Sequence, residues 1–476
     1  MHIVFFNPQG NFDPADSYLA EHPDFGGQLV YVKEVAQAMA DQGHKVDILT
    51  RRMEDPAWPE FSAPEETYPG YEGRLRILRF DCGGAGFMDK EKLWPHMAEM
   101  VDNVLAFYGD DLPDFATTHY ADGGYCGVLA RAKAGLGFTL TGHSLGAQKM
   151  DKLGTGAANW ADMEARYKFS KRIAAERMAM AGAARIVVST GQEQREQYAH
   201  PLYRGAVDPA DAKFRVIPPG VNGRVFSTRA GTADAEVTAA LDARFGDDKR
   251  PVTVVSSRLD EKKNILGVAK AYAVEPGLRE KAALVLCVRG IDDPARDIGN
   301  LGPAEQAVLR EILAVIEEAG LGEHVYFLNI RSQAELAATY RYFGKRGSVF
   351  ALTSFYEPFG LAPIEAAACG LAPVATSHGG PTEIFADGSG VLVDPFSPDD
   401  IAKGLMDALD RHADLSVRAI RRVEETYTWA RTAEAYLGAI ADAIAEGAGE
   451  AAAPGDLDAE GLIQDYFASP EHAASQ

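Results

Sequence analysis

The sequence is poor in cysteine, poor in cations relative to its acids, and has no long apolar run. Its four cysteines, Cys82, Cys126, Cys287 and Cys369, lie far apart without Cys-x-x-Cys spacing, which disfavours a disulfide framework and a zinc site. We expect all four to be buried and reduced. The formal net charge is −22, so most of the surface would repel a nucleic acid or an anionic membrane. An anionic small substrate would therefore need a local basic pocket.

Three further classes of protein lose support. No apolar stretch approaches the ~20 residues that span a bilayer. Residues 1–6 lead directly into a strand-like run without a basic segment before it, so no secretory signal is visible and a cytoplasmic protein is expected. No Gly-x-Gly-x-x-Gly fingerprint follows the first predicted strand, which disfavours an NAD-dependent oxidoreductase.

Apolar runs alternate with helical patterns through most of the chain. At 476 residues, with 46% hydrophobic and 24% charged residues, two globular domains of about 200 residues each are the natural expectation. Continuous apolar strands separated by helices predict βαβ units and parallel sheets. The runs span residues 2–6, 45–49, 75–80, 138–141, 185–189, 252–256, 283–288, 325–329, 349–353 and 372–375.

A Pro/Gly-rich break at residues 216–222, VIPPGVN, suits a link between domains. We predict an α/β protein with two doubly wound parallel-sheet domains, 1–220 and 221–425, facing a cleft. Because parallel sheets bind ligands beyond the carboxyl ends of their strands, the chemistry is expected in that cleft. Residues 426–445 are predicted to be a helical segment that returns to the N-terminal domain. Residues 446–476 are predicted to be a weakly ordered tail, in which residues 461–467 could form one short helix.

The pentapeptide Gly-His-Ser-Leu-Gly at residues 142–146 fits the nucleophile elbow of α/β-hydrolases. It follows a short apolar strand, as that motif requires. However, the next helix carries Lys149, Asp151 and Lys152 almost immediately, which is a poor face to bury at the centre of a hydrolase fold. A nucleophilic Ser144 is therefore disfavoured. His143 is either a site residue at the end of its strand or a structural histidine.

A second motif, EPFGLAPIE at residues 357–365, follows the predicted strand 349–353 and leads into an alanine-rich helix. A strand, a glycine loop and a helix start place backbone N–H groups and the positive helix end at the strand's carboxyl edge, where a diphosphate can bind. Glu357 in the loop and Glu365 in the helix would reach different parts of one elongated ligand. The alternative is a helix with two solvated acids.

Two other loops have the same position at strand ends. Arg258 and Lys263, five residues apart in SSRLDEKKN, can converge on one anion, although a solvated charged turn remains an alternative. Gly26 and Gly27 precede a predicted helix and permit close backbone approach to a ligand.

Together these features resemble the retaining GT-B glycosyltransferases. The segments NPQGNFDPADSY, EHPDFGGQLVYVKEV, THYADGG, TGHSLGAQKM, IPPGVN, SSRLDEKKN and SFYEPFGLAPIEA resemble, in order, those of the bacterial sucrose-phosphate synthases of that class. The similarity covers about residues 1–445.

The resemblance implies an activity. Glucose would pass from a nucleoside diphosphate sugar, preferably UDP-glucose, to fructose 6-phosphate with retained configuration, giving sucrose 6-phosphate and UDP. Arg258, Lys263 and helix-end amides would stabilise the departing diphosphate, whose own oxygen would help to deprotonate the acceptor on the same face. No obligatory metal is expected, with Mg²⁺ at most stimulatory.

The resemblance also assigns site residues. Glu357 would bind the glucosyl hydroxyls, Glu365 the ribose, and the backbone near Ile330 the base. The implied catalytic residues are His143, Glu357, Arg258 and Lys263. The implied donor-binding residues are Gly27, Arg258, Lys263, Ile330, Glu357, Phe359, Gly360, Leu361 and Glu365. The implied acceptor-binding residues are Gly26, Gln28, Lys90, Tyr120, Ser144, Lys149 and Arg172.

Several alternatives stay open at this stage. The chain could be a mannosylfructose-phosphate synthase using GDP-mannose, a sucrose synthase using free fructose, or an inactive sugar-phosphate sensor. Lys149 and Arg172 disfavour free fructose, although Arg172 could also belong to a solvated charged face. Plant and some bacterial synthases carry an appended phosphatase domain that this sequence lacks, so a separate sucrose-phosphate phosphatase is expected in the pathway.

Overall fold

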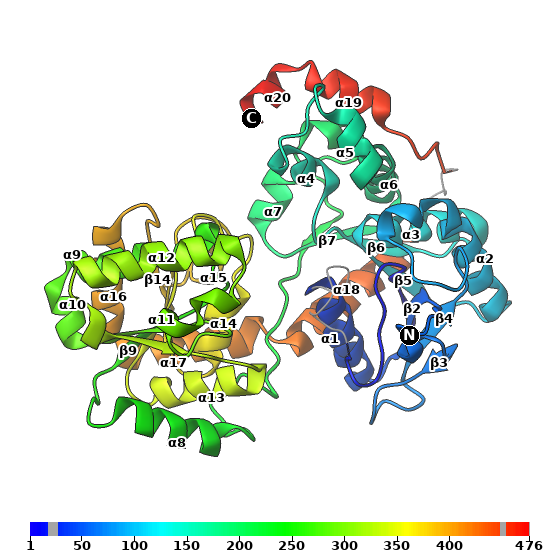
Figure 1. The fold of residues 1–476 in the computed structure, drawn as a ribbon. Helices are drawn as coiled ribbons and strands as arrows, with labels where there is room; N and C mark the ends of the chain where they lie inside the picture. Colours follow the sequence, from blue (N-terminus) through cyan, green and yellow to red (C-terminus); the bar gives the residue numbers. More distant parts are fainter. Residues whose placement is uncertain (18–26, 448–453, 476) are drawn as a thin grey trace. The chain divides into compact units, whose positions relative to one another are not determined.

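The computed structural model describes residues 1–17, 27–447 and 454–475 (Figure 1). The chain divides into two compact units, Met1–Pro218 with Thr432–Gln476 (unit 1) and Pro219–Arg431 (unit 2). The sequence placed these divisions at 220 and 425. The difference arises because Thr432 Oγ1 donates to the Pro218 carbonyl at 2.8 Å within unit 1, while Val221 N donates to the Tyr427 carbonyl at 2.8 Å within unit 2.

Unit 1 contains an eight-stranded sheet in the order β3-β4-β2-β1-β5-β6-β7-β8. All neighbouring strands are parallel except β3 and β4, which are antiparallel. The strands are β1 (His2–Phe6), β2 (Lys45–Arg51), β3 (Glu65–Glu66), β4 (Leu75–Phe80), β5 (Phe115–His119), β6 (Phe138–Thr141), β7 (Arg185–Val188) and β8 (Phe214–Val216).

Helices cover the sheet of unit 1. Helices α2, α3 and α6 pack side by side, and α1 packs against β2 and β4. The α-helices of this unit are α1 (Gly27–Asp41), α2 (Met97–Tyr108), α3 (Tyr120–Ala134), α4 (Gly146–Lys152), α5 (Trp160–Tyr167), α6 (Phe169–Gly182), α7 (Gly191–Glu196), α18 (Trp429–Glu446), α19 (Glu460–Phe467) and α20 (Pro470–Ser475). The 3₁₀ turns are η1 (Pro59–Phe61), η2 (Lys90–Lys92), η3 (Trp94–His96) and η4 (Pro201–Tyr203).

Unit 2 contains a six-stranded, fully parallel sheet in the order β11-β10-β9-β12-β13-β14. Its strands are β9 (Val252–Ser256), β10 (Ala283–Cys287), β11 (Val325–Leu328), β12 (Val349–Leu352), β13 (Ala372–Thr376) and β14 (Val391–Val393). Both faces are buried, because neighbouring residues such as Val254 and Val255 belong to two different apolar clusters. The predicted doubly wound parallel sheets are thus confirmed.

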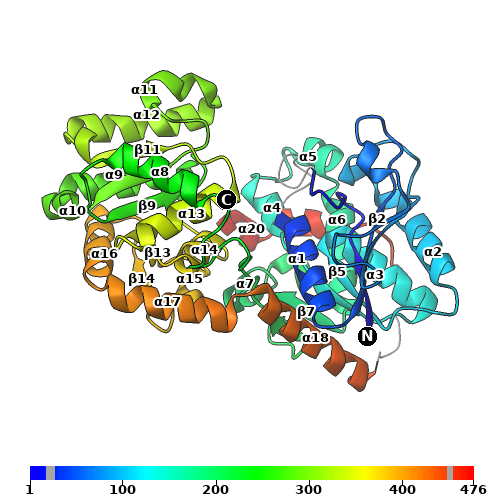
Figure 2. The same ribbon diagram turned by 90° about the horizontal axis from the view of Figure 1, so that it is seen from below.

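The two apolar clusters of unit 2 lie on opposite faces of its sheet. Helices α9, α12 and α16 cover one face, and α8, α13, α14 and α17 cover the other (Figures 1 and 2). The α-helices are α8 (Asp234–Phe245), α9 (Ile265–Val274), α10 (Pro276–Lys281), α11 (Pro294–Asp297), α12 (Pro303–Glu318), α13 (Gln333–Gly344), α14 (Leu361–Ala368), α15 (Pro381–Ile384), α16 (Pro398–Asp410) and α17 (His412–Thr426). The 3₁₀ turns are η5 (Glu261–Lys263), η6 (Ile298–Asn300) and η7 (Gly322–His324).

Strand β5 was not predicted, although it lies between β1 and β6 at the middle of its sheet. Three of its five residues, Thr117, Thr118 and His119, are polar, yet all three have 0% exposure. Their polar atoms make hydrogen bonds inside the protein, as when Thr118 Oγ1 donates to the Thr139 carbonyl on β6 at 2.7 Å. A search for apolar runs misses such a strand. The same search for apolar runs also missed the short strands β3, β8 and β14.

The prediction of a weakly ordered tail is wrong for residues 454–475. Helix α19 corresponds to the short helix expected at residues 461–467, whereas α20 was not expected. Ala459, Ile463 and Tyr466 are buried in the core of unit 1 and hold α19 in place. The burial of these residues was not predicted, because they are few and lie among polar neighbours. Residues 448–453 lie outside the described part of the chain.

The four cysteines are free and buried, as predicted. Burial raises the pKa of the Cys82, Cys287 and Cys369 thiols to about 12. The helices described in residues 1–17, 27–447 and 454–475 include none that is both long and apolar enough to cross a membrane.

Candidate active site

The predicted acceptor-binding residues of unit 1 gather at the carboxyl edge of its sheet. Lys90, Tyr120 and Arg172 line one pocket, and Tyr167 joins them there. They come from distant parts of the chain: Lys90 begins η2, Tyr120 begins α3 directly after β5, and Arg172 lies in the first turn of α6. The full lining is Gln9, Lys90, Glu91, Trp94, Tyr120, Asp122, Tyr167 and Arg172.

Arg172 is a buried cation with defined partners. Its side chain is only 5% exposed, and its Nε donates to Glu176 Oε1 at 3.0 Å. Its guanidinium lies 4.5 Å from the centroid of the Tyr120 ring, and it also donates to the Ser144 carbonyl. Burial opposes the charge, but the Glu176 carboxylate beside it holds the pKa of Arg172 above its usual range. The alternative of a solvated charged face is therefore excluded.

Lys149 lies close to this pocket on α4. Its Nζ is 4.4 Å from the centroid of the Tyr167 ring, a cation–π contact. Burial, together with the positive charges of Arg172 and Lys90, lowers the pKa of Lys149 to about 8. The three cations are thus close enough to repel one another, which is the arrangement that a dianionic ligand such as a phosphate would relieve.

His143 and Ser144 form a strained turn after β6. His143 has φ of 55°, and Ser144 N donates to the Gly142 carbonyl at 2.6 Å, which closes a three-residue turn around His143. His143 Nε2 lies 2.9 Å from Nδ1 of His119, and burial lowers the pKa of His143 to about 4. His143 is therefore a neutral imidazole at neutral pH.

The structure does not support the hydrolase hypothesis, because no histidine in the described part of the chain is positioned as a catalytic base for Ser144. Ser144 is exposed, and among the described residues its hydroxyl makes no hydrogen bond to a histidine. Its neighbour His143 pairs with His119 instead. In a nucleophile elbow the serine itself occupies the strained position, whereas here the positive φ belongs to His143.

His119 is a site residue that sequence reasoning missed. It ends β5 and is fully buried, and burial with the adjacent His143 lowers its pKa well below the usual value. Its position directly before Tyr120 was the available signal, but the strand that carries it was not recognised. Gln28 donates through Nε2 to Asn7 Oδ1 at 2.8 Å, and Gly27 is exposed at the start of α1. Gly26 lies outside the described residues.

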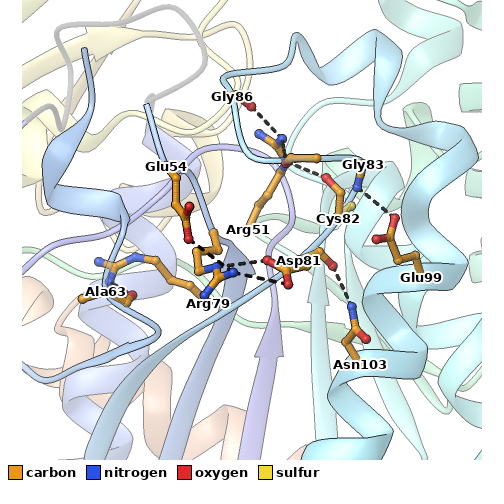
Figure 3. Close-up of polar contacts among 12 residues, drawn as sticks. Arg51, Glu54, Ala63, Arg79, Asp81, Cys82, Gly83, Gly86, Glu99 and Asn103 are labelled. Carbon is orange, nitrogen blue, oxygen red and sulfur yellow. Dashed lines mark hydrogen bonds and ion pairs between the residues drawn. The ribbon is translucent and has the colours of Figure 1, made fainter. Parts of the chain in front are cut away.

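A buried arginine organises the turn that leads to Lys90. Arg51, only 1% exposed at the end of β2, donates through Nε to the Cys82 carbonyl at 2.7 Å (Figure 3). Its Nη2 donates to the carbonyls of Gly84 and Gly86 at 2.6 and 2.7 Å. One guanidinium thus fixes three backbone carbonyls, those of Cys82, Gly84 and Gly86, shortly before Lys90.

A cavity of about 540 Å³ lies at the carboxyl ends of β9, β10 and β11 in unit 2, and two of the predicted donor-binding residues line it. The other predicted donor-binding residues of this unit are not among its lining residues: Lys263, Glu357, Phe359, Gly360, Leu361 and Glu365. Arg258 and Ile330 both line it, as their positions after two of these strands require. Arg289 and Glu305 are lining residues that the sequence did not suggest. The full lining is Ser256, Ser257, Arg258, Leu259, Cys287, Val288, Arg289, Glu305, Ile330, Arg331, Ser332, Gln333 and Leu336.

Lys263 pairs with Glu357. Lys263 Nζ donates to Glu357 Oε2 at 2.7 Å, although the two residues lie on different loops. The sequence placed Lys263 beside Arg258 on one anion, whereas the described side-chain contacts place it beside the carboxylate. Arg258 is exposed at the cavity instead.

Two glycines fix the loop that carries Glu357. Gly379 has φ of 104°, and a Cβ there would lie 2.1 Å from the Glu357 carbonyl oxygen. Gly380 N donates to that same oxygen at 2.8 Å, and Glu357 N donates to the His378 carbonyl at 3.1 Å. Sequence reasoning missed Gly379 and Gly380. The available signal was a Gly-Gly pair between a strand and a helix, as at Gly26 and Gly27.

Helix α14 begins beside this loop. Gly360, with φ of 114°, is its N-cap and provides no side-chain cap for the first amides, so Leu361 N–H faces outward from the helix start. Glu365 lies within α14, and burial raises the pKa of its carboxyl to about 7. Its carboxylate has no hydrogen bond with another described side chain. Phe359 is half-buried, with its ring 6.0 Å from that of Tyr427.

Two family models match the chain, one in each part. "Glycosyl transferase 4-like domain" matches residues 26–220, and "Glycosyl transferases group 1" matches residues 240–426. The solved structure of the sucrose-phosphate synthase of Thermosynechococcus elongatus aligns with a TM-score of 0.64 at 25% identity, over 94% of this chain and 100% of that one. The two doubly wound units are those of a GT-B glycosyltransferase.

Comparison with named relatives shows to which family of GT-B glycosyltransferases the chain belongs. A probable sucrose-phosphate synthase of Thermosipho melanesiensis is 43% identical over 442 residues, which are 92% of this chain and 96% of that protein. The sucrose-phosphate synthase of Zea mays is 30% identical over 93% of this chain, which spans only 47% of the maize protein. The chain belongs to the sucrose-phosphate synthase family.

Proposed function

We propose that this protein transfers glucose from UDP-glucose, or another nucleoside diphosphate glucose, to fructose 6-phosphate and releases sucrose 6-phosphate. The reaction retains the α-configuration of the donor. Membership of the family supports this activity, and the geometry supports its division between a phosphate-binding acceptor region in unit 1 and a nucleotide-sized cavity in unit 2.

The observation that carries the acceptor assignment is the group of three cations around one pocket. Arg172, Lys149 and Lys90 are neighbours in a protein whose formal net charge is −22. A free sugar offers no charge to match them, while the phosphate of a sugar phosphate does. This favours fructose 6-phosphate over free fructose. The sugar hydroxyls of fructose 6-phosphate would bind Tyr120, Ser144 and Gln28. Gly26, which lies outside the described residues, would be a further contact.

On the donor side, the base would bind near Ile330 and the ribose would bind Glu365. A half-buried carboxylate without a side-chain partner suits the hydroxyl pair of a ribose. The diphosphate would meet Arg258, Lys263 and the backbone amides at the start of α14, which follow Phe359 and Gly360. Gly27 on α1 offers open space at a backbone amide for the same group.

The chemical step places charge on the departing diphosphate. Lys263 and Arg258 stabilise that charge, and the diphosphate oxygen takes the proton of the attacking acceptor hydroxyl on the same face. Glu357, held at 2.7 Å from Lys263, orients the glucosyl hydroxyls. Neutral His143 hydrogen bonds the glucosyl unit near its reacting carbon. None of these steps assigns a covalent role to Ser144.

No metal is assigned to these steps. Among residues 1–17, 27–447 and 454–475, no three His, Cys, Asp or Glu side chains form a metal-binding group. We propose that turnover continues in EDTA and that Mg²⁺ is at most stimulatory. The product, a phosphorylated disaccharide, would require a separate phosphatase to become sucrose, and both steps are proposed to occur in the cytoplasm.

A donor-by-acceptor screen tests the assignment. UDP-, ADP- and GDP-glucose and GDP-mannose would each be offered with fructose 6-phosphate and with free fructose, and the product identified by mass spectrometry and NMR. We expect α-linked sucrose 6-phosphate, with fructose 6-phosphate strongly preferred over fructose. Mannosylfructose phosphate as the main product, equal use of free fructose, or no nucleotide release with any pair would each contradict the proposal.

A further inference from the structure

The C-terminal helices α19 and α20 are joined to unit 1 by specific polar contacts as well as by apolar packing. Ile463 and Tyr466 are buried, with 0% and 5% exposure, while Glu460, Gln464 and Asp465 are exposed. Figure 1 shows α19 and α20 lying over α5 and α4. Three contacts lead to α4, which carries Lys149, and to α5 and η4, whose residues contact Lys149 or the partner of Arg172.

The first contact is with α4. Tyr466 OH lies 3.2 and 3.1 Å from the two carboxylate oxygens of Asp151, to which it donates. His200 Nε2 lies 2.9 Å from Asp151 Oδ2, so the same carboxylate is held from two sides. Asp151 is two residues after Lys149 in a helix of only seven residues. A helix this short has little stability of its own, so its position depends on such tertiary contacts.

The second contact is with α5. Trp160 Nε1 donates to Glu460 Oε1 at 3.1 Å, and the Trp160 ring packs 5.7 Å from that of Phe467. Trp160 is the first residue of α5 and Tyr167 is the last. The ring of Tyr167 is the surface on which Lys149 Nζ rests. Helix α19 therefore holds both the helix that carries the Lys149 cation and the helix that carries its aromatic platform.

The third contact is with η4. Helix α19 packs against this turn, whose Tyr203 hydroxyl accepts from Ala147 N at 3.1 Å and donates to Glu176. Glu176 in turn accepts from Arg172 Nε at 3.0 Å. The backbone of α4 and the partner of Arg172 are thus linked through Tyr203, which ends the turn against which α19 packs.

We propose that residues 454–475 form a positioning clamp for the acceptor phosphate, with Tyr466 and Asp151 at its centre. The inference rests on the proposed function, because it takes Lys149 and Arg172 as ligands of that phosphate. Tyr466 and Asp151 act through α4 and touch no substrate. A displacement of about 1 Å at a binding group can greatly weaken catalysis, so the clamp sets acceptor affinity. Every contact described here is within unit 1, so donor affinity is left unchanged.

The test is the variant Tyr466→Phe, which keeps the buried ring and removes the hydroxyl that donates to Asp151. The matched control is Asp465→Asn, an exposed change on the same helix. We expect the KM for fructose 6-phosphate to rise about 3- to 10-fold in Tyr466→Phe, as the loss of one hydrogen bond to a charged group allows. The KM for UDP-glucose and all constants of the control should stay within about twofold. A chain ending at Gly455 should show a larger rise in acceptor KM.

Hydrogen–deuterium exchange of residues 146–152 provides a readout that does not depend on activity. Exchange should be faster in Tyr466→Phe than in the parent protein and unchanged in the control. Slower acceptor use with faster exchange supports the clamp. Unchanged exchange, an unchanged acceptor KM, or equal increases in both KM values would overturn it. If the parent protein itself does not use fructose 6-phosphate, the proposed function fails, while the exchange rates still decide whether Tyr466 positions α4.

Discussion

The two proposed ligand-binding regions, one in each unit, are built by different means. In unit 1, buried side chains of opposite charge are linked to one another, as Arg172 is linked through Glu176 to Tyr203. In unit 2, the donor region consists of a cavity of about 540 Å³ and a loop whose shape depends on close backbone approach at Gly379 and Gly380. The acceptor region is fixed by side chains and the donor region largely by backbone.

This difference follows from the ligands that we propose. A sugar phosphate is small and carries its charge at one end, so a few fixed cations can both bind and orient it. A nucleotide sugar is long, and many of its contacts can be made by amides at helix starts and strand ends. Replacement of a cationic side chain should therefore act most on acceptor binding, and backbone-altering replacements should act most on the donor region.

Glu357→Gln should have the largest effect, because it removes the one charged side chain of the donor loop that contacts the reacting sugar in the proposed site. We expect kcat to fall by about 10²–10⁴-fold, the range found for electrostatic and acid–base groups. UDP should still bind, as measured by calorimetry, since the lost contact is to the sugar. Glu425→Gln, on the exposed surface of α17, is the control. An unchanged kcat in Glu357→Gln would show that Glu357 does not orient the glucosyl hydroxyls.

Gly379→Ala tests the role of the backbone. The added Cβ would lie 2.1 Å from the Glu357 carbonyl oxygen in a conformation with φ of 104°, so the loop must move. We expect a loss of about 2 kcal/mol or more in stability, measured by thermal unfolding, together with a fall in kcat. Gly223→Ala, whose Cβ would meet no described atom within 4 Å, is the control. Equal behaviour of the two variants would show that close approach is not required.

The pH dependence of acceptor use should reveal Lys149. Because its pKa is lowered to about 8 and the charged form binds phosphate, kcat/KM for fructose 6-phosphate should fall as the pH rises through 8. The decrease approaches about tenfold per pH unit only if binding requires the cation. Lys149→Arg should abolish this fall in kcat/KM at high pH, since arginine stays charged throughout. If the fall persists in Lys149→Arg, a group other than Lys149 causes it.

Ser144→Ala should have the smallest effect, a few-fold increase in the KM for fructose 6-phosphate with little change in kcat. The hydroxyl would provide one neutral hydrogen bond, worth about 0.5–1.5 kcal/mol. A serine-directed fluorophosphonate should leave no adduct on Ser144. A stable adduct, with ester hydrolysis that disappears in Ser144→Ala, would restore the hydrolase hypothesis.

The sequence predicted those parts of the fold that follow from apolar periodicity. Strands such as β1 and β9 are continuous apolar runs, and both parallel sheets could be inferred from them. Strand β5 could not, because three of its five buried residues are two threonines and a histidine, whose hydrogen-bond partners are visible only in the folded chain. The ordered tail could not either, because its burial depends on a surface formed by α5 and η4.

The site shows the same division. Motifs containing Arg258, Glu357 and Lys149 could be found by residue type and spacing, since each follows a strand or begins a helix. The pairing of Lys263 with Glu357, and of His119 with His143, could not be predicted because each joins loops that are distant in the sequence. The need for glycine at position 379 also could not be predicted, because it arises from the close approach of the Glu357 backbone in the folded chain.

The state of the cysteines has a practical consequence. Cys82, Cys126, Cys287 and Cys369 are buried in the cores of the two units, and burial raises the pKa of each thiol. Alkylating reagents react with exposed thiolates, so the native chain should be almost inert to maleimide dyes while it is folded. A single cysteine introduced at an exposed position would then carry a fluorophore without prior removal of the native four, and reaction of the native thiols would itself report unfolding.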